Sequence, residues 1–283
     1  MAFDYKKEYK EFYLPKNRPQ IVEIPEMNFI AVRGKGDPNE EGGAYKAAIG
    51  LLYTVAFTIK MSKMGSHRIE GYFDYVVPPL EGFWEQEGGK GVDFTHKEAF
   101  QWISVIRLPE FVQKADVEWA VAEAGRKKGQ DFSKVEFLTV REGMCVQCMH
   151  IGPYDEEPAT VAHMDQYLLG NGYVNDFSSG RMHHEIYLSD VRKVAPERWK
   201  TVIRHPVKKK EGGIENITSH PKTENRLLLS LMLPILAEQI LRSFMGTANT
   251  FMLSRISDEA SAAVGVSNQI LNVVIITATM IGS

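Results

Sequence analysis

The chain has 283 residues, enough for one large domain or two of ordinary size. Hydrophobic residues make up 44% of it and charged residues 24%, so most of the chain is expected to fold around a core. The net charge of −3 argues against a nucleic-acid partner that is found by bulk electrostatics.

The two cysteines, Cys145 and Cys148, form a C-x-x-C pair. A structural zinc site needs a second pair or nearby histidines at suitable spacing, and a redox pair normally opens a helix. Here the pair falls inside a predicted strand, so we expect two reduced thiols that point to opposite faces, and neither a metal nor a cofactor. The polar start of the chain does not have the pattern of a signal peptide.

The first half of the charged region is predicted to run strand, helix, strand, strand, followed by one more helix. Alternating apolar residues indicate strands, and apolar residues at helical spacing indicate helices. The predicted elements are a strand at 21–34, a helix at 43–64, strands at 71–77 and 101–107, and a helix at 111–128. Pro78-Pro79 and the run Gly88-Gly89-Lys90-Gly91 are predicted loops.

The same order of elements then returns in the second half. The predicted elements are a short lead-in strand at 135–141, a strand at 144–151, a helix at 158–169, and strands at 183–188 and 201–207. Two copies of one strand–helix–strand–strand unit predict an α+β fold with pseudo-two-fold symmetry and a cleft between the halves.

The strand at 183–188 carries an unusual set of side chains. Its alternation places His183, Glu185 and Tyr187 on one face and His184 on the other. A carboxylate beside a phenol and an imidazole is suited to a pocket for a cationic or polarised aromatic ligand. The alternative is a solvated face of an antiparallel sheet, with both histidines exposed to water.

The two halves contribute different chemistry to such a cleft. The first half supplies Phe83, Trp84 and Trp102, and the second supplies Tyr154 and the residues around Glu185. A buried carboxylate is costly unless it is paired, so one in an aromatic cleft awaits a cation or has a raised pKa. A cation over an indole face gains about 0.5–2 kcal/mol. For Trp84 and Trp102, a place in the core is the alternative.

Three stretches resemble the GyrI-like small-molecule-binding family. They are Leu80-Glu81-Gly82-Phe83-Trp84, then His150-Ile151-Gly152-Pro153-Tyr154 with the residues up to Thr160, and then His184-Glu185-Ile186-Tyr187-Leu188-Ser189-Asp190. The resemblance covers about residues 1–208 and implies two βαββ units in tandem around a central cleft. It also implies binding of bulky lipophilic, often cationic, aromatic compounds, as in the effector domains of multidrug-responsive regulators.

Some stand-alone proteins of that family look like hydrolases that open strained cyclopropane rings in DNA-damaging natural products. By this resemblance Glu185 is the strand carboxylate, and a hydrolytic role would make Glu185 and Tyr154 catalytic. The residues expected to bind the ligand are Phe83, Trp84, Trp102, His183 and Tyr187. The alternative is a module that senses or sequesters drugs, with Glu185 only matching the ligand's charge. No helix-turn-helix pattern with a basic face precedes the domain, so a complete DNA-binding regulator is not expected.

The last part of the chain differs in composition. A polar, glycine-containing linker is predicted at 209–224, and residues 225–283 are predicted to form two transmembrane helices, with a lipid bilayer as partner through 227–281. Leu233-Pro234-Ile235 and Met245-Gly246-Thr247-Ala248-Asn249-Thr250 resemble the start of a MATE-type multidrug efflux transporter, of which only two spans are present. Basic residues before the first span place the large domain in the cytoplasm, tethered to the inner membrane. An amphipathic helical hairpin is the alternative.

Overall fold

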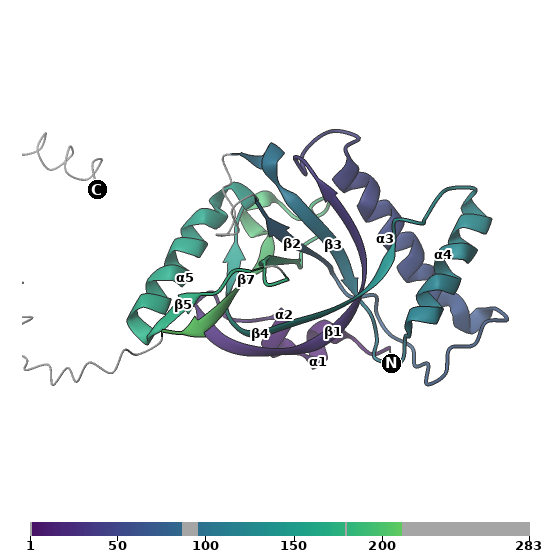
Figure 1. The fold of residues 1–283 in the computed structure, drawn as a ribbon, viewed down its shortest axis with the longest axis horizontal. Helices are drawn as coiled ribbons and strands as arrows, with labels where there is room; N and C mark the ends of the chain where they lie inside the picture. Colours follow the sequence, from purple (N-terminus) through teal and green to yellow (C-terminus); the bar gives the residue numbers. More distant parts are fainter. Residues whose placement is uncertain (1, 87–95, 179, 211–283) are drawn as a thin grey trace, which may run out of the picture. The chain divides into compact units, whose positions relative to one another are not determined.

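A seven-stranded antiparallel sheet forms the centre of the computed structural model, which describes residues 2–86, 96–178 and 180–210. The strands lie in the order β4-β1-β3-β2-β6-β7-β5, and β4 also pairs with β7. Six strands therefore close into a ring, with β5 attached at its margin (Figure 1). The strands are β1 (Gln20–Lys35), β2 (Leu80–Glu85), β3 (Gln101–Arg107), β4 (Glu136–Ile151), β5 (Tyr173–Asn175), β6 (His183–Tyr187) and β7 (Lys200–Lys209).

The order of elements repeats along the chain, as the sequence pattern predicts. The first half runs β1, α3 (Ala44–Lys60), β2, β3, and the second runs β4, α5 (Glu157–Asn171), β6, β7. Two seams join the halves, because β1 pairs with β4 and β2 pairs with β6. At the second seam Gly82 lies opposite Glu185, and Trp84 lies opposite His183. Strand β2 of the first half thus pairs with β6, the strand that carries the candidate carboxylate.

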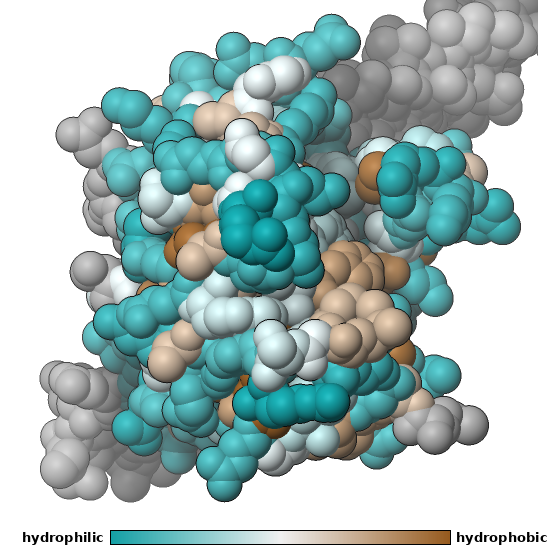
Figure 2. All heavy atoms as spheres, turned by 90° about the vertical axis from the view of Figure 1, so that its right-hand side faces the viewer, coloured by the Kyte–Doolittle hydropathy of each residue, from teal (hydrophilic) through white to brown (hydrophobic). Residues whose placement is uncertain are grey.

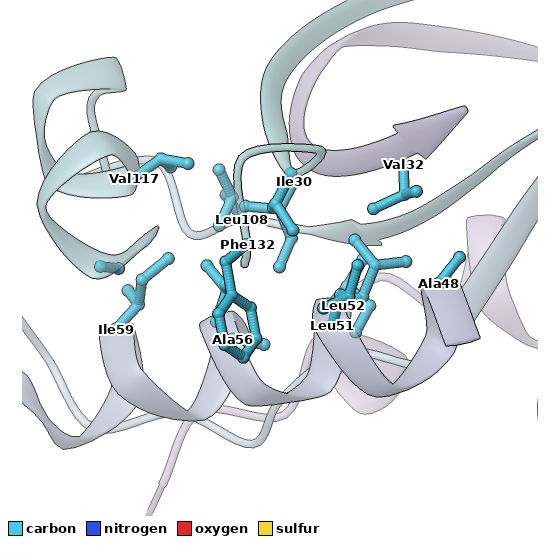
Figure 3. Close-up of a cluster of buried hydrophobic side chains, with 14 of the residues drawn as sticks. Ile30, Val32, Ala48, Leu51, Leu52, Ala56, Ile59, Leu108, Val117 and Phe132 are labelled. Carbon is cyan, nitrogen blue, oxygen red and sulfur yellow. The ribbon is translucent and has the colours of Figure 1, made fainter. Parts of the chain in front are cut away.

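Helices α3 and α5 pack on the same face of the sheet. The buried side of α3 contacts Ile30 and Val32 of β1, and its apolar residues Ala48, Leu52 and Ile59 recur at the spacing of a helical face (Figure 3). The buried side of α5 packs on β4 and β7 through a second apolar cluster. In Figure 1, α5 lies at the left of the molecule and α3 at the right.

Helix α4 (Lys114–Lys128) packs beside α3 and ends at Gly129, whose φ of 62° is left-handed and favours glycine. Only Val117, Ala120 and Ala124 of this helix are buried. The face of the molecule seen in Figure 2, which is the right-hand side of Figure 1, is mostly hydrophilic with a smaller apolar area.

The opposite face of the sheet is covered by the N-terminal segment. Two short helices, α1 (Tyr5–Glu8) and α2 (Lys10–Tyr13), bury Tyr5 and Tyr13. The sequence analysis did not predict them, because four-residue helices carry too few turns for a periodic pattern. Four 3₁₀ turns complete the described elements: η1 (Met61–Met64), η2 (Lys97–Ala99), η3 (Tyr154–Glu156) and η4 (Pro196–Arg198).

One strand prediction is wrong, and another pair of predicted strands differs in its bounds. Residues 71–77 form only an isolated bridge between Tyr75 and Phe3, and the strand of this region is β2, which starts directly after the two prolines. Pro78 and Pro79 have no backbone N–H to donate to a ladder, and here they stand directly before β2. The predicted strands at 135–141 and 144–151 are one strand, β4, which continues through Gly143 with a φ of 66°.

The predicted membrane hairpin and most of the predicted linker lie outside the described residues. Within 2–86, 96–178 and 180–210, no helix has both the length and the apolar character that a bilayer crossing requires. The described residues belong to one compact unit, Met1–Glu211.

Candidate functional site

Both faces of β6 are buried. His183 and His184 are 0% exposed and Glu185 is 7% exposed, so the alternative of a solvated face with exposed histidines is wrong. His183, Glu185 and Tyr187 lie on the face that carries α3 and α5, and His184 lies on the opposite face, as the alternation of the strand predicts.

The Glu185 carboxylate is held by its own strand. Its Oε1 lies 2.8 Å from His183 Nε2, and its Oε2 accepts a hydrogen bond of 2.7 Å from the Tyr187 hydroxyl. Burial acts to raise the pKa of Glu185, but the hydrogen bonds from His183 and Tyr187 outweigh it and leave that pKa below its ordinary value. Glu185 is therefore a buried carboxylate that stays ionised at neutral pH.

The Tyr187 hydroxyl connects this carboxylate to the first half of the chain. Trp84 Nε1 donates to it over 3.1 Å, and the Tyr45 hydroxyl of α3 lies 3.5 Å away. Gly82 makes the approach possible, since a Cβ there would lie 2.7 Å from Trp84 Nε1 and 3.1 Å from the Tyr187 hydroxyl. The position opposite Glu185 therefore needs a glycine.

A second histidine, His205 of β7, extends the chain of polar contacts. His205 Nε2 lies 2.7 Å from His183 Nδ1. An ionised carboxylate only accepts, so His183 Nε2 donates to Glu185 and the second ring nitrogen of His183 meets His205. Burial and the neighbouring His183 hold the pKa of His205 well below its ordinary value, so His205 is neutral. The sequence analysis missed His205, although it alternates with Ile203 and Val207 on a buried strand face.

Tyr154 and Trp199 stand beside this cluster. The Tyr154 ring centroid is 5.8 Å from that of Tyr187 and 4.9 Å from that of Trp199, and all three rings are half-buried. The Tyr154 hydroxyl makes no hydrogen bond to any residue that the structure describes. Burial, with the nearby carboxylates, raises the pKa of Tyr154, so its proton stays in place as a potential donor.

A second carboxyl group, Glu157, reaches the same place from the first residue of α5. It is 1% exposed, and burial together with the adjacent Glu185 raises its pKa well above the ordinary value. An acidic residue at the start of a helix is normally explained as charge that complements the helix dipole. Glu157 is spaced from Met164 and Leu168, the other buried residues of α5, so that all three lie on the inward side of the helix. This helical spacing is the sequence signal that could have predicted the burial of Glu157.

The two remaining predicted ligand residues lie on different faces of the sheet, and Trp102 is the register partner of Trp84. Trp102 is 3% exposed, covers Gly34 of β1, and has its ring centroid 5.1 Å from that of Tyr45. Phe83 lies on the opposite face of the sheet, stacked on His184 with ring centroids 4.1 Å apart. The structure thus brings together Glu185, Tyr187, Trp84, Tyr154 and His183, and it does not bring Phe83 to them.

The opposite face of β6 holds a separate buried ion cluster. His184 lies 2.9 Å from Glu142 Oε2 through Nδ1 and 2.9 Å from Glu81 Oε2 through Nε2, and Arg204 lies 2.9 Å from Glu142 Oε1. The pKa of Glu142 is held at about 2, because His184 and Arg204 outweigh the effect of burial. Arg204 also donates to the Phe12 carbonyl, so this cluster fixes the N-terminal segment to the sheet.

Two surface hollows are found among the described residues near the predicted site residues. One of about 650 Å³ lies between β4 and the start of α5, and one of about 400 Å³ lies beside Phe83 and Trp102. Glu185 lines neither of them. Within the described ranges, no group of histidine, cysteine and acidic side chains is arranged to hold a metal ion.

An ionised, buried carboxylate beneath half-buried aromatic rings is suited to a small molecule that is flat, apolar and positively charged or polarised. The fold and this cluster therefore define a small-molecule-binding domain. The model of the GyrI-like small molecule binding domain matches residues 18–208, and the chain belongs to this family.

Solved structures and a curated protein are similar to parts of the chain. The crystal structure of an uncharacterized conserved protein from Listeria innocua is 50% identical, has a TM-score of 0.69, and covers 73% of this chain and 100% of its own. That of a hydrolase from Listeria innocua is 48% identical, has a TM-score of 0.66, and has the same coverage of 73% and 100%. The uncharacterized transporter YisQ of Bacillus subtilis (strain 168) is 49% identical over 63 residues, which is 22% of this chain and 14% of YisQ.

Proposed function

We propose that the chain binds bulky lipophilic, cationic aromatic compounds on the surface between α3 and α5, above the Glu185 carboxylate. The observation that carries this proposal is the ionised Glu185 beneath the half-buried rings of Tyr187, Tyr154 and Trp199. A buried anion attracts a cation more strongly than an exposed one does, and aromatic rings bind apolar, flat molecules without needing a fixed hydrogen-bond pattern.

The same residues are arranged to assist the addition of water to a strained ring. In this step the water oxygen bonds to an electrophilic ring carbon, the ring carbon–carbon bond breaks, and its electron pair moves to a conjugated oxygen of the substrate. Glu185 takes the proton that the water loses. Tyr187 already donates to Glu185, so Tyr154 is the phenol that remains able to donate to the oxygen that gains charge. The half-buried rings hold the flat substrate in place.

The binding test uses the lipophilic cation tetraphenylphosphonium and the quenching of tryptophan fluorescence by the full chain. We expect Glu185→Gln to weaken the binding by about tenfold or more, which corresponds to about 1.4 kcal/mol. Glu156→Gln is the matched control, because Glu156 is exposed and one residue from Glu157. Unchanged affinity in Glu185→Gln would remove the carboxylate from the ligand site.

Turnover separates hydrolysis from binding alone. A cyclopropane-bearing aromatic substrate is incubated with the chain, and mass spectrometry follows the product that has gained one water. The 48% identical hydrolase from Listeria innocua supports the hydrolytic reading. Equal turnover by wild type and Glu185→Gln would contradict it, and binding without turnover leaves a sequestering or drug-sensing module as the function.

The region beyond residue 210 carries a separate proposal. We infer that residues 225–283 anchor the chain in the inner membrane and resemble the start of a MATE-type exporter, so that a drug-binding domain on the cytoplasmic side acts together with an exporter. The 49% identity over 63 residues to the transporter YisQ supports a relation to transporters. Membrane fractionation tests this proposal, since full-length chain that stays in the supernatant without detergent would contradict it.

A further inference from the structure

His150, near the end of β4, belongs to the stretch that leads to Tyr154, and the proposed function gives it no role. The residue is buried, and both of its ring nitrogens have partners. Nε2 lies 3.0 Å from the Pro153 carbonyl oxygen, and Nδ1 lies 2.9 Å from Thr160 Oγ1 on α5. A carbonyl oxygen only accepts, so Nε2 donates to Pro153, whereas the Thr160 hydroxyl is able to donate or accept at Nδ1. The imidazole therefore bridges the turn after β4 and the helix α5.

Pro153 directly precedes Tyr154, the phenol that the proposed function places beside the oxygen that gains charge. Its carbonyl accepts two hydrogen bonds, one from His150 and one of 3.0 Å from the backbone N–H of Glu156. The bond from Glu156 lies within the 3₁₀ turn η3, whereas the bond from His150 ties that turn to β4. Because the peptide unit is planar, the direction of the Pro153 carbonyl fixes the direction in which the chain enters Tyr154.

Gly152 allows the imidazole to approach this turn. Its φ of 144° lies in the region that favours glycine, and a Cβ there would lie 3.0 Å from Glu156 Oε2 and 3.5 Å from His150 Nε2. The N–H of Gly152 donates to the Trp199 carbonyl over 3.0 Å. The Trp199 ring in turn packs against the Tyr154 ring, with centroids 4.9 Å apart. The same turn therefore holds both the phenol and the indole beside it.

We propose that His150 is a positioning residue, whose hydrogen bond to the Pro153 carbonyl holds the Tyr154 hydroxyl where it donates to the substrate oxygen that gains charge. This proposal rests on the proposed function. His150 itself takes part in no bond that forms or breaks. A reacting or donating group that is displaced by about 1 Å costs about 100-fold in rate. The loss falls on kcat rather than on KM, because the contact with the charged oxygen exists only in the transition state.

Two substitutions separate the two hydrogen bonds of the imidazole. The amide nitrogen of glutamine reaches the place of Nε2, so His150→Gln keeps a donor to the Pro153 carbonyl. The amide of asparagine reaches only the place of Nδ1, so His150→Asn keeps the contact with Thr160 and loses the one with Pro153. With the cyclopropane-bearing aromatic substrate, we expect kcat to fall about tenfold or more in His150→Asn with KM little changed, and to be largely restored in His150→Gln. His163→Asn is the matched control, because His163 of α5 is exposed. Equal kcat in wild type and His150→Asn, or equal losses in the two His150 variants, would overturn the proposal.

A second readout follows Tyr154 without turnover. The full chain is labelled with 3-fluorotyrosine, and the ¹⁹F signal of Tyr154 is identified by its absence from Tyr154→Phe. The rings of Trp199 and Tyr187 lie 4.9 and 5.8 Å away and shift this signal from that of an exposed tyrosine. We expect the signal to move toward the exposed value in His150→Asn and to keep its place in His150→Gln and His163→Asn. An unmoved signal in folded His150→Asn would show that His150 only fills the core, and would overturn the proposal.

Thr160→Val serves as a second variant if His150→Asn does not fold. It keeps the imidazole and removes the hydroxyl that contacts Nδ1, so we expect the Tyr154 signal to move in the same direction by a smaller amount. An unmoved signal in Thr160→Val then contradicts the proposal. The two proposals fail separately. If wild type does not turn over the substrate, the hydrolytic function is wrong and the ¹⁹F signal still decides the role of His150. If wild type turns it over and His150→Asn is as fast, only the positioning role is wrong.

Discussion

The indole nitrogen of Trp84 donates a hydrogen bond of 3.1 Å to the hydroxyl of Tyr187, which itself donates to Glu185 over 2.7 Å. Trp84 belongs to the first half of the duplicated fold and Tyr187 to the second. A single hydroxyl therefore ties the two halves together and fixes the orientation of the carboxylate on which the candidate site depends.

Removing that hydroxyl tests the connection. Tyr187→Phe leaves Trp84 Nε1 and one oxygen of Glu185 without this partner, and a buried polar group without a partner costs about 1–3 kcal/mol. We expect the free energy of unfolding in urea to fall by about 1–3 kcal/mol. Tyr154→Phe is the control, because the Tyr154 ring keeps its contacts and its hydroxyl bonds to none of the described residues. Equal stability of Tyr187→Phe and wild type would contradict the role of the hydroxyl.

A methyl group at Gly82 is expected to disturb the same place. Its Cβ would lie 2.7 Å from Trp84 Nε1, and overpacking of this kind costs about 1–3 kcal/mol. Gly82→Ala is therefore destabilised and binds tetraphenylphosphonium less tightly than wild type. In contrast, Gly50→Ala in α3 meets nothing within 4 Å and is expected to gain about 0.5–1 kcal/mol from helix propensity. Thermal unfolding measures the melting temperature of both variants. If both melting temperatures shifted in the same direction, the crowding explanation for Gly82 would be wrong.

The ion cluster on the other face of β6 predicts a loss of stability in acid. Glu142 has a pKa lowered from 4.5 to about 2, so its carboxylate stabilises the fold above pH 4.5 and this contribution is lost as the pH falls toward 2. Glu142→Gln leaves Arg204 buried without its ion-pair partner and removes one of the two carboxylates that contact His184, so it is expected to cost about 3–5 kcal/mol at neutral pH. Urea unfolding from pH 7 to pH 3 measures both effects.

Glu123 provides the comparison for Glu142. Its pKa is also lowered to about 2, but by Arg126 and Lys127 at the surface of α4. Glu123→Gln is expected to change the stability far less than Glu142→Gln, because exposed ion pairs are screened by water. Similar losses in the two variants would mean that burial does not decide the strength of the Glu142 contacts.

Glu157 predicts a pH dependence of the opposite sign. Its pKa in the folded chain lies well above the ordinary 4.5, so the unfolded chain loses this proton first as the pH rises. The wild-type free energy of unfolding therefore declines from about pH 4.5 upward until Glu157 ionises in the folded state. Glu157→Gln lacks this decline and is expected to be more stable than wild type at pH 8. A variant that declines in parallel with wild type would assign the effect to other groups.

The two thiols are expected to react slowly in the folded chain. Cys145 and Cys148 are free, 0% and 1% exposed, and burial raises the pKa of Cys148 to about 11. The thiolate is the reactive form, so a disulfide reagent at pH 8 should label native Cys148 at least about 100-fold more slowly than the unfolded chain. Rapid labelling without denaturant would show that this part of β4 opens readily.

The alternation of β6 was sufficient to predict which of its side chains share a face. His183, Glu185 and Tyr187 do lie together, because successive side chains of a strand alternate between its two faces. The pairing of β6 with β2 keeps the strand regular over these residues. Burial of both faces was not predictable from β6 itself. The cover comes from α3 and α5 on one side and from the N-terminal segment on the other, and both are distant in sequence.

The position of Glu157 shows a different limit. Its place on the buried stripe of α5 could be read from helical spacing, yet an acidic residue in the first helical turn is normally explained by the helix dipole. Only the packing of α5 onto β4 and β7 shows that this carboxyl group is buried. Phe83 is the converse case: it neighbours Trp84 in sequence, and the strand period sends the two rings to opposite faces.

The closed ring of strands has a consequence for dissection of the molecule. Each half would expose two unpaired strand edges if it were alone, because the ring closes only through the β1–β4 and β2–β6 seams. The link between α4 and β4 crosses neither seam. Cutting the gene there would give two complementary fragments, and since Trp84 and Tyr187 fall on different fragments, indole emission would report their reassembly. The duplicated architecture therefore provides two fragments whose association can be followed by tryptophan fluorescence.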